Sequence, residues 1–251
     1  MFDLHGRVAV VTGASSGLGR QFALALAGQG ADIVLLARRM EKLQAVAEEV
    51  RAKGVKALCV KCDVCELEDI QNAVKATIDE FGKVDILVNN AGGGPLYPVF
   101  ETPDDFWQHG VDLELTAVFR CIREFGREMA KAGYGRIINN SSLFGRIGTG
   151  AIPISNYCAV KGGVVNMTRE VAAELCKFGI TCNCVCPGFF PSESNNPEAM
   201  EAMGPWIESR VPMGRAGVEG ELDSTIIYLA ADESSYVNGA IVSCDGGWTA
   251  T

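Results

Sequence analysis

The sequence has 251 residues, of which 48% are hydrophobic and 21% charged, and its formal net charge is −9. This length allows a sizeable buried core, and the composition is that of a folded globular protein rather than a disordered chain. A surface with this negative charge repels phosphate backbones and anionic lipids. We therefore expect no nucleic acid and no membrane among the partners of this protein.

The start of the chain, Met1-Phe2-Asp3, has neither a basic segment nor a long apolar one. No apolar run approaches the roughly 20 residues that are needed to cross a bilayer, so we expect a cytoplasmic protein. The 10 cysteines would suit disulfides in a secreted protein. A chain of this length does not need such cross-links, and free thiols are the expectation.

Short runs rich in Val, Ile and Leu alternate with longer amphipathic stretches along the chain. This alternation is typical of β-α units around a parallel sheet that is buried on both faces. The predicted strands are 7–12, 32–37, 56–61, 84–89, 135–141, 180–186 and 240–244. The predicted helices are 17–29, 40–53, 66–81, 112–131, 155–178 and 218–231. No linker interrupts the pattern, so residues 1–251 are predicted to form a single α/β domain.

A glycine-rich turn follows the first predicted strand directly and opens the first helix. Such a turn lets the backbone approach a pyrophosphate, whose charge is attracted by the helix N-terminus. The residues expected to bind a cofactor here are Gly13, Ser15, Ser16, Gly17, Leu18 and Gly19. Three glycines alone would be equally consistent with a tight turn.

Further motifs follow this turn in a fixed order along the chain. They are Asn89-Asn90-Ala91-Gly92, Ser142, Tyr157-x-x-x-Lys161, Pro187-Gly188 and Asp245-Gly246-Gly247-Trp248. With Thr12-Gly13-x-x-x-Gly17-x-Gly19, this set resembles the short-chain dehydrogenase/reductase family over nearly the whole chain, including its 3-oxoacyl reductase, hydroxysteroid dehydrogenase and gluconate 5-dehydrogenase-like members. The resemblance implies a doubly wound Rossmann-type domain with strand order 3-2-1-4-5-6-7, a nicotinamide cofactor and a homotetramer.

The end of the second predicted strand bears on the choice of cofactor. NAD sites of this type usually carry Asp or Glu there, whereas this chain has Ala37-Arg38-Arg39. A guanidinium can hold a 2′-phosphate, so NADP(H) is the expected cofactor and NAD(H) the alternative. Two observations argue against NADP(H). Ser16 stands where many NADP-preferring relatives have a second basic residue, and Arg39 could simply be a solvated charge at the start of a helix.

The resemblance also assigns cofactor contacts along the rest of the chain. Asp63 and Val64 match an adenine-contacting pair, and Asn90 and Gly92 match contacts near the ribose. The expected contacts near the nicotinamide are Tyr157, Lys161, Pro187, Gly188, Phe190 and Ser192.

Tyr157 and Lys161 are the expected proton-transfer pair, because the chain has only 2 histidines for a His-based hydrolase or zinc site. Four residues apart on a predicted helix, the two side chains lie on one face. The ammonium is expected to lower the pKa of the phenol, so that Tyr157 gives or takes the hydroxyl proton while the nicotinamide transfers hydride. Alone, such a pair is frequent on amphipathic helices, and only its position after the other motifs favours catalysis.

Ser142 is expected to orient the substrate oxygen, with Ser141 as the rival. The family carries an asparagine in the helix after the fourth strand, and the alignment places Glu114 there. A buried carboxylate near Lys161 would shift the titration of the lysine or offer another proton route. We expect an active enzyme with an altered relay; the alternative is a nucleotide-sensing protein that has lost turnover.

Residues 187–217 contain five prolines among Met and Trp residues, which indicates a lid over the substrate or, alternatively, a surface excursion with its own small core. Phe144, Met200, Met203 and Trp206 are predicted to form an apolar wall. Such a wall favours a ketone or secondary alcohol on a steroid, polyketide-like ring or acyl chain. Sugar acids and polyols remain the alternative substrates.

Cys59-x-x-Cys62-x-x-Cys65 has the spacing of an iron-sulfur site, for which Cys186 would be a distant fourth ligand. The same segment must also serve as the third strand and the adenine pocket. We therefore predict no metal, and interpret Cys182, Cys184 and Cys186 as small buried side chains of the sixth strand.

Overall fold

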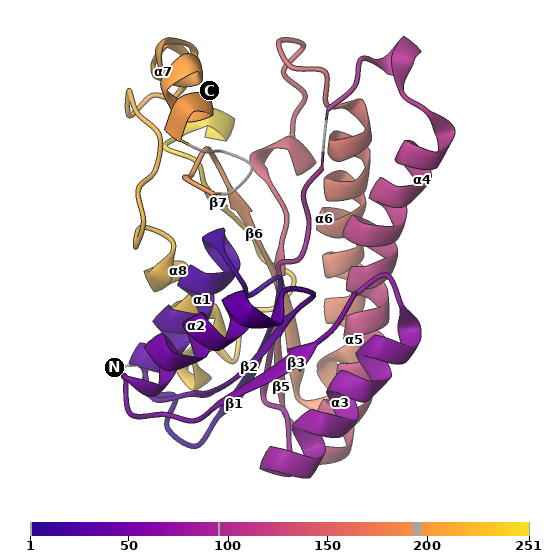
Figure 1. The fold of residues 1–251 in the computed structure, drawn as a ribbon, viewed down its shortest axis with the longest axis vertical. Helices are drawn as coiled ribbons and strands as arrows, with labels where there is room; N and C mark the ends of the chain where they lie inside the picture. Colours follow the sequence, from indigo (N-terminus) through magenta and orange to yellow (C-terminus); the bar gives the residue numbers. More distant parts are fainter. Residues whose placement is uncertain (1, 95, 193–196, 251) are drawn as a thin grey trace.

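A single parallel sheet organises the chain in a computed structural model that describes residues 2–94, 96–192 and 197–250 (Figure 1). Its seven strands lie in the order β3-β2-β1-β4-β5-β6-β7, and every neighbouring pair is parallel. The strands are β1 (Val8–Thr12), β2 (Asp32–Ala37), β3 (Ala57–Lys61), β4 (Ile86–Asn89), β5 (Gly135–Asn140), β6 (Ile180–Pro187) and β7 (Ile241–Cys244). The predicted α/β class and strand order are confirmed, with strand ends displaced by at most two residues.

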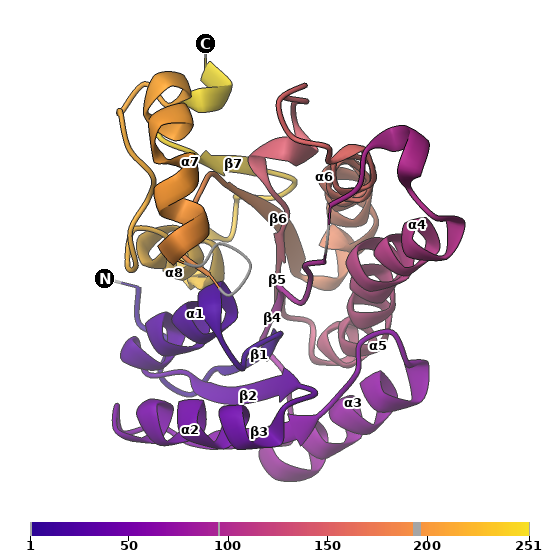
Figure 2. The same ribbon diagram turned by 45° about the horizontal axis from the view of Figure 1, so that its top comes forward.

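Helices cover both faces of this sheet, as Figure 2 shows. One face packs against α1 (Gly17–Gly28), α2 (Met40–Arg51) and α8 (Asp223–Ala230). The other packs against α3 (Leu67–Phe81), α5 (Ala117–Ala132) and α6 (Ser155–Leu175). Within the described parts of the chain, every helix is too short or too polar to span a lipid bilayer.

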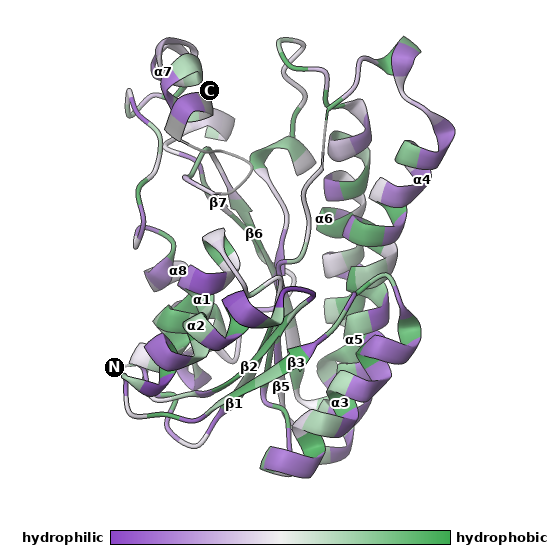
Figure 3. Cartoon of the chain, in the orientation of Figure 1, coloured by the Kyte–Doolittle hydropathy of each residue, from purple (hydrophilic) through white to green (hydrophobic). Residues whose placement is uncertain are grey.

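Most residues of the strands are apolar because each face of the sheet has its own core. Along β1, Ala9 and Val11 join the cluster under α1, whereas Val8 and Val10 join the cluster under α5 and α6. All four are at most 2% exposed. Figure 3 shows the result as hydrophobic strands in the centre and hydrophilic outer faces on the helices. Alternate residues of a strand face opposite sides, so a parallel strand in this position needs an unbroken apolar run.

The helix predicted at 112–131 begins earlier than expected. Helix α4 (Asp104–Val111) leads through a π-helical turn, η2 (Asp112–Thr116), into α5 without a break. Pro103 and the two aspartates that follow it favour the start of a helix at this point. The glycine at position 110 disfavours a helix interior and so makes this start harder to recognise in the sequence. Insertions of one residue into a helix are often found at functional sites.

The segment predicted as irregular contains α7 (Pro197–Arg210), a helix with Pro205 in its interior. Its Trp206 packs edge to face against Phe189 and Trp248, with ring centroids 5.7 Å and 5.2 Å away. Phe144 joins the same cluster, in which Met200 is also partly buried. This part of the chain therefore has a small core of its own beside β7.

Candidate active site

The candidate site lies at the carboxyl ends of β1, β4, β5 and β6. A cavity there is lined by the glycine turn, residues 90–94, residues 140–142 and residues 187–190. Glu114 of the π-helical turn and Tyr157 and Lys161 of α6 complete it. Ligand crevices of open α/β sheets form at this edge, because the connections on either side of a reversal in strand order diverge.

The glycine turn is packed too tightly for larger residues. A Cβ at Gly13, whose φ is +65°, would lie 2.8 Å from Ala91 Cα, and one at Gly19 would lie 2.3 Å from the Gly13 carbonyl oxygen. Thr12 Oγ1 ties the turn to the end of β4 by accepting from the backbone N–H groups of Asn90 and Ala91 at 2.9 Å and 3.0 Å. The backbone N–H groups of the first turn of α1 therefore lie at the cavity. The positive end of the helix dipole can there attract the negative charge of a pyrophosphate.

Arg39 and Arg38 differ in where they point. Arg39 Nη2 donates to Ser15 Oγ at 2.9 Å and to Ser16 Oγ at 3.0 Å, so its guanidinium lies against the glycine turn. Arg38 instead pairs with Asp63, with 3.7 Å between Nη1 and Oδ2. The positive charge next to the turn therefore comes from Arg39.

The two serines after β5 have different partners. Ser141 is buried and donates its hydroxyl to the main-chain carbonyl of Lys161 at 2.9 Å. Ser142 Oγ accepts from the Phe144 N–H at 3.2 Å, which leaves its hydrogen available for another acceptor. Of the two hydroxyls, the one of Ser142 is placed to hydrogen-bond a ligand in the cavity.

Lys161 is 5% exposed and donates to the carbonyl oxygen of Asn140 at 3.1 Å. Its Nζ lies 5.5 Å from the centre of the Tyr157 ring. Burial opposes the ammonium, but the charges of Glu114 and Tyr157 outweigh it and raise the pKa of Lys161. The ion pair with Glu114 therefore favours the protonated amine.

The pKa of Tyr157 is raised overall, although Lys161 lowers it as expected. Burial of the phenol is the largest cause, and the Glu114 carboxylate adds to it. The ammonium of Lys161 and the hydroxyl of Ser142 favour the phenolate but do not outweigh these effects. The effect of Lys161 has the expected direction, and the net direction differs because the expectation left out the cost of desolvation and the opposing carboxylate.

The Glu114 side chain points into the site. Its Oε2 lies 2.9 Å from Lys161 Nζ, and its Oε1 accepts from the Gly93 N–H at 3.1 Å. No donor among the described residues is well aligned with Oε2, so the contact with Lys161 is an ion pair rather than a linear hydrogen bond. A Cβ at position 92 would lie 2.9 Å from Oε2, so the glycine there leaves room for the carboxylate.

Most predicted site residues meet in the cavity, and some do not. Those that line it are Gly13, Ser16, Gly17, Leu18, Asn90, Gly92, Glu114, Ser142, Phe144, Tyr157, Lys161, Pro187, Gly188, Phe190, Ser192 and Met203. Those outside its lining are Ser15, Gly19, Arg38, Arg39, Asp63, Val64, Met200 and Trp206. The predicted apolar wall is therefore incomplete, because Met200 and Trp206 pack into the small core around Trp248.

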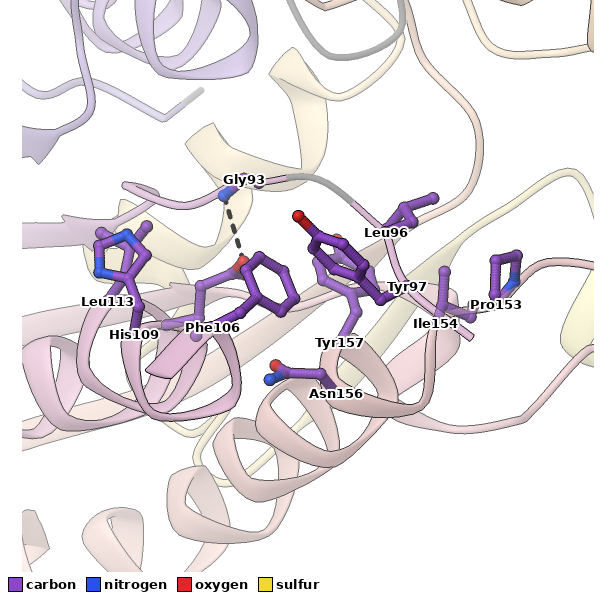
Figure 4. A pocket seen from close by; sticks show the side chains of 13 residues that line it. Gly93, Leu96, Tyr97, Phe106, His109, Leu113, Pro153, Ile154, Asn156 and Tyr157 are labelled. Carbon is purple, nitrogen blue, oxygen red and sulfur yellow. Dashed lines mark hydrogen bonds between the residues drawn. The ribbon is translucent and has the colours of Figure 1, made fainter. Parts of the chain in front are cut away.

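Sequence reasoning missed Asn140 and a pocket beside Tyr157. Asn140 follows Asn139 at the end of β5, a pair of polar residues that is a usable signal, and its side chain donates to Asn90 Oδ1 at 2.9 Å. The pocket, called the side pocket below, is lined mainly by Leu96, Tyr97, Phe106, Leu113, Ile154 and Tyr157 (Figure 4). Tyr97 and Phe106 pack edge to face in it, with ring centroids 4.6 Å apart. Its walls come from segments far apart in sequence, so no local pattern reveals it.

The thiols do not gather into a metal site. Among the described residues, no three His, Cys, Asp or Glu side chains lie together in a way that would hold a metal ion. Burial raises the pKa of Cys62 to about 12 and that of Cys65 to about 11.

Comparison with known proteins finds reductases and dehydrogenases that match nearly the whole length of this chain. A family model described as enoyl-(acyl carrier protein) reductase matches residues 13–249. The chain is 35% identical over 240 residues to the 3-oxoacyl-[acyl-carrier-protein] reductase FabG of Staphylococcus epidermidis, covering 95% of this chain and 97% of the relative. It is 36% identical over 246 residues to the (2S)-[(R)-hydroxy(phenyl)methyl]succinyl-CoA dehydrogenase subunit BbsD of Thauera aromatica, covering 97% of each.

A solved structure agrees with these relatives. The gluconate 5-dehydrogenase of Burkholderia cenocepacia, in complex with NADP and tartrate, matches with a TM-score of 0.94 and 34% identity. The match covers 100% of this chain and 98% of that one.

Proposed function

The chain belongs to the short-chain dehydrogenase/reductase family of oxidoreductases, and on this premise we propose that it interconverts a ketone on an apolar skeleton and the secondary alcohol, using NADP(H). The observation that carries the proposal is the meeting of Ser142, Tyr157 and Lys161 in the cavity that the glycine turn also lines. We also propose a small-molecule substrate; the homotetramer stays a prediction.

The proposed roles follow from the contacts of each side chain. In ketone reduction, the Ser142 hydroxyl hydrogen-bonds the carbonyl oxygen and Tyr157 gives that oxygen its proton. The carbonyl carbon would receive a hydride, which is the chemistry that a nicotinamide cofactor supplies when bound. Lys161 keeps an ammonium beside the tyrosinate that remains, and alcohol oxidation reverses each transfer.

The fit of a dinucleotide is supported by the glycine turn. A Cβ at Gly13 or Gly19 would clash with the backbone of Ala91 or of Gly13, so the glycines permit the tight turn that brings the N-terminus of α1 to the cavity. The guanidinium of Arg39 against Ser15 and Ser16 supports NADP(H), because a 2′-phosphate next to the turn would meet a bidentate cation there. The solved gluconate 5-dehydrogenase with bound NADP points the same way.

An apolar substrate is supported by the side pocket. Leu96, Phe106 and Ile154 offer carbon surface immediately beside Tyr157, where the substituent of a bound ketone would lie. A polyol would leave hydroxyls unpaired against these three side chains, at about 1 to 3 kcal/mol for each buried group, whereas His109, Glu114 and Asn156 offer polar partners elsewhere in the pocket. The relative named as a hydroxy(phenyl)methyl-succinyl-CoA dehydrogenase agrees with a ring or acyl skeleton, whereas the gluconate 5-dehydrogenase agrees with the sugar-acid alternative.

A spectrophotometric assay tests the proposal. The purified protein is given NADPH or NADH with cyclic and aryl ketones, a 3-oxoacyl thioester and a keto sugar acid, and loss of nicotinamide absorbance is followed. We expect turnover of the apolar ketones with NADPH, abolished in Tyr157→Phe and retained in Tyr236→Phe, a control at a fully exposed tyrosine. Turnover of the sugar acid alone would overturn the substrate class, and tight NADPH binding without any turnover would favour a nucleotide sensor.

A further inference from the structure

Glu114 and Lys161 form a buried ion pair at the base of the candidate site. Both side chains are 6% exposed, and 2.9 Å separates Oε2 from Nζ. The carboxylate is also fixed to the backbone of the segment after β4 through Gly93. The pair thus joins the π-helical turn, the β4 loop and α6, three parts of the chain that are distant in sequence.

Folding stability is a poor reason for such a pair. Removing two charges from water costs several kcal/mol for each ion, and well-packed apolar residues of similar size often do as well or better. The contact is also not isolated in the core, because Glu114 and Lys161 both line the cavity beside Tyr157. An effect of the ion pair on the properties of the candidate site therefore explains its presence better than a contribution to folding stability.

The pair changes the net charge that Tyr157 meets. On α6 the phenol faces the ammonium of Lys161 and the thiol of Cys158, and from η2 it faces the Glu114 carboxylate. The hydroxyl of Ser142 approaches it from the end of β5, and His109 of α4 lines the side pocket on the other flank. The thiol of Cys184 on β6 adds to the groups that face Lys161.

The sum of these charges is nearly zero because one carboxylate cancels one ammonium. With an amide at position 114, a full positive charge would remain beside the phenol and favour tyrosinate. With the carboxylate present, the stabilisation of tyrosinate by the ammonium is largely cancelled, and Tyr157 keeps its proton to higher pH.

We propose that Glu114 is a positioning residue that clamps Lys161 by its carboxylate and so keeps Tyr157 in its proton-donating form into the alkaline range. The inference rests on the proposed function. Ketone reduction then keeps its rate to higher pH, and alcohol oxidation begins only at higher pH. The equilibrium between ketone and alcohol is unchanged, since a catalyst alters both directions together.

The test is a set of pH profiles of kcat and KM for alcohol oxidation in wild type, Glu114→Gln, Glu114→Asn and Glu114→Asp. We expect the acidic limb of kcat to move down by about one pH unit in the Gln and Asn variants, because a neighbouring charge is lost. Glu114→Asp keeps the charge on a shorter side chain and should shift less than the Gln and Asn variants. Glu80→Gln on the exposed side of α3 is the matched control and should superimpose on wild type.

Three outcomes would overturn the inference. The first is a Gln or Asn profile identical to wild type in a folded variant, and the second is an equal shift in Glu114→Asp, which would indicate shape rather than charge. The third is a change confined to KM. If Glu114→Gln does not fold, Glu114→Asn, which places the family's own residue there, gives the same comparison.

A readout without turnover separates this inference from the proposed function. The absorbance of tyrosinate is titrated in wild type and Glu114→Gln, each with and without Tyr157→Phe, so that the difference reports Tyr157 alone. We expect its midpoint to be lower in Glu114→Gln. That result with no ketone turnover would defeat the proposed function only, whereas equal midpoints in an active enzyme would defeat the inference only.

Discussion

The guanidinium of Arg39 lies against the glycine turn and donates to the Ser15 hydroxyl at 2.9 Å. Its neighbour Arg38 faces away, toward Asp63. Two adjacent arginines that are equivalent in a sequence therefore have different surroundings, and only one is next to the proposed pyrophosphate site.

Arg39→Gln should weaken NADPH selectively. A charge-assisted hydrogen bond contributes about 1.5 to 3 kcal/mol, so KM for NADPH should rise about tenfold or more while KM for NADH changes little. Steady-state kinetics with both cofactors measure this, and Arg38→Gln should show a smaller loss. An equal effect of Arg39→Gln on the two cofactors would mean that the guanidinium does not meet a 2′-phosphate.

Gly19→Ala and Gly28→Ala compare two glycines of the same helix. A Cβ at Gly19 would lie 2.3 Å from a backbone oxygen, whereas one at Gly28 would lie 4.0 Å from the nearest atom outside its own helix, in the Lys53 side chain. Gly19→Ala should lower Tm and abolish cofactor binding, and Gly28→Ala should leave Tm unchanged or raise it slightly. Thermal unfolding with and without NADPH checks both; normal binding by Gly19→Ala would exclude a close approach of the turn to the ligand.

The two serines after β5 should separate into a structural and a catalytic residue. Ser142→Ala removes a hydroxyl at the cavity and should lower kcat by about 10² with little change in Tm. Ser141→Ala removes a buried hydrogen bond to the Lys161 carbonyl, which lies inside α6, and should cost about 0.5 to 1.5 kcal/mol of unfolding free energy. Chemical denaturation and kinetics of both variants decide the assignment, and reversed effects would make Ser141 the orienting residue.

Phe106→Ala should impair ketones according to their size. The ring lines the side pocket and packs on Tyr97, so a bulky apolar substrate would lose about 1.5 to 3 kcal/mol of contact, a rise in KM of about 10- to 100-fold. A small ketone that does not fill the pocket should be nearly unaffected. Phe100→Ala, at a fully exposed ring, is the control. Equal effects on large and small ketones would place the substrate elsewhere.

Acid stability should depend on Asp232, at the opposite edge of the sheet from the cavity. Burial opposes its charge, but hydrogen bonds from Tyr134 and Arg7 outweigh burial and lower its pKa. A carboxyl whose pKa is lower in the folded state stabilises the fold above its unfolded pKa of about 3.9 and loses that contribution as pH falls. Asp232→Asn should therefore lower Tm at pH 7 more than at pH 3, with activity retained; a uniform loss at both pH values would contradict this.

Several features of the fold and site could be predicted because they are local. Val8 to Val11 predict a buried parallel strand by composition alone, and the four-residue interval between Tyr157 and Lys161 predicts one helix face. The start of α4 was missed because its signals, Pro103 and two aspartates, compete with a glycine six residues further on. Met200 and Trp206 were misplaced because an apolar residue in a long connection can cover a ligand or pack on its neighbours, and sequence does not distinguish these.

The sequence by itself determined the order of the strands, the turn at Gly13 and the helix that carries Tyr157, since each depends on a short pattern of residues and on resemblance. Only the tertiary structure decided that Glu114 meets Lys161, that Arg39 rather than Arg38 faces the turn, and that a side pocket adjoins Tyr157. The physical reason is that these contacts join segments far apart in the chain. Their geometry is fixed by how helices pack on the sheet, and no periodicity within one segment encodes it.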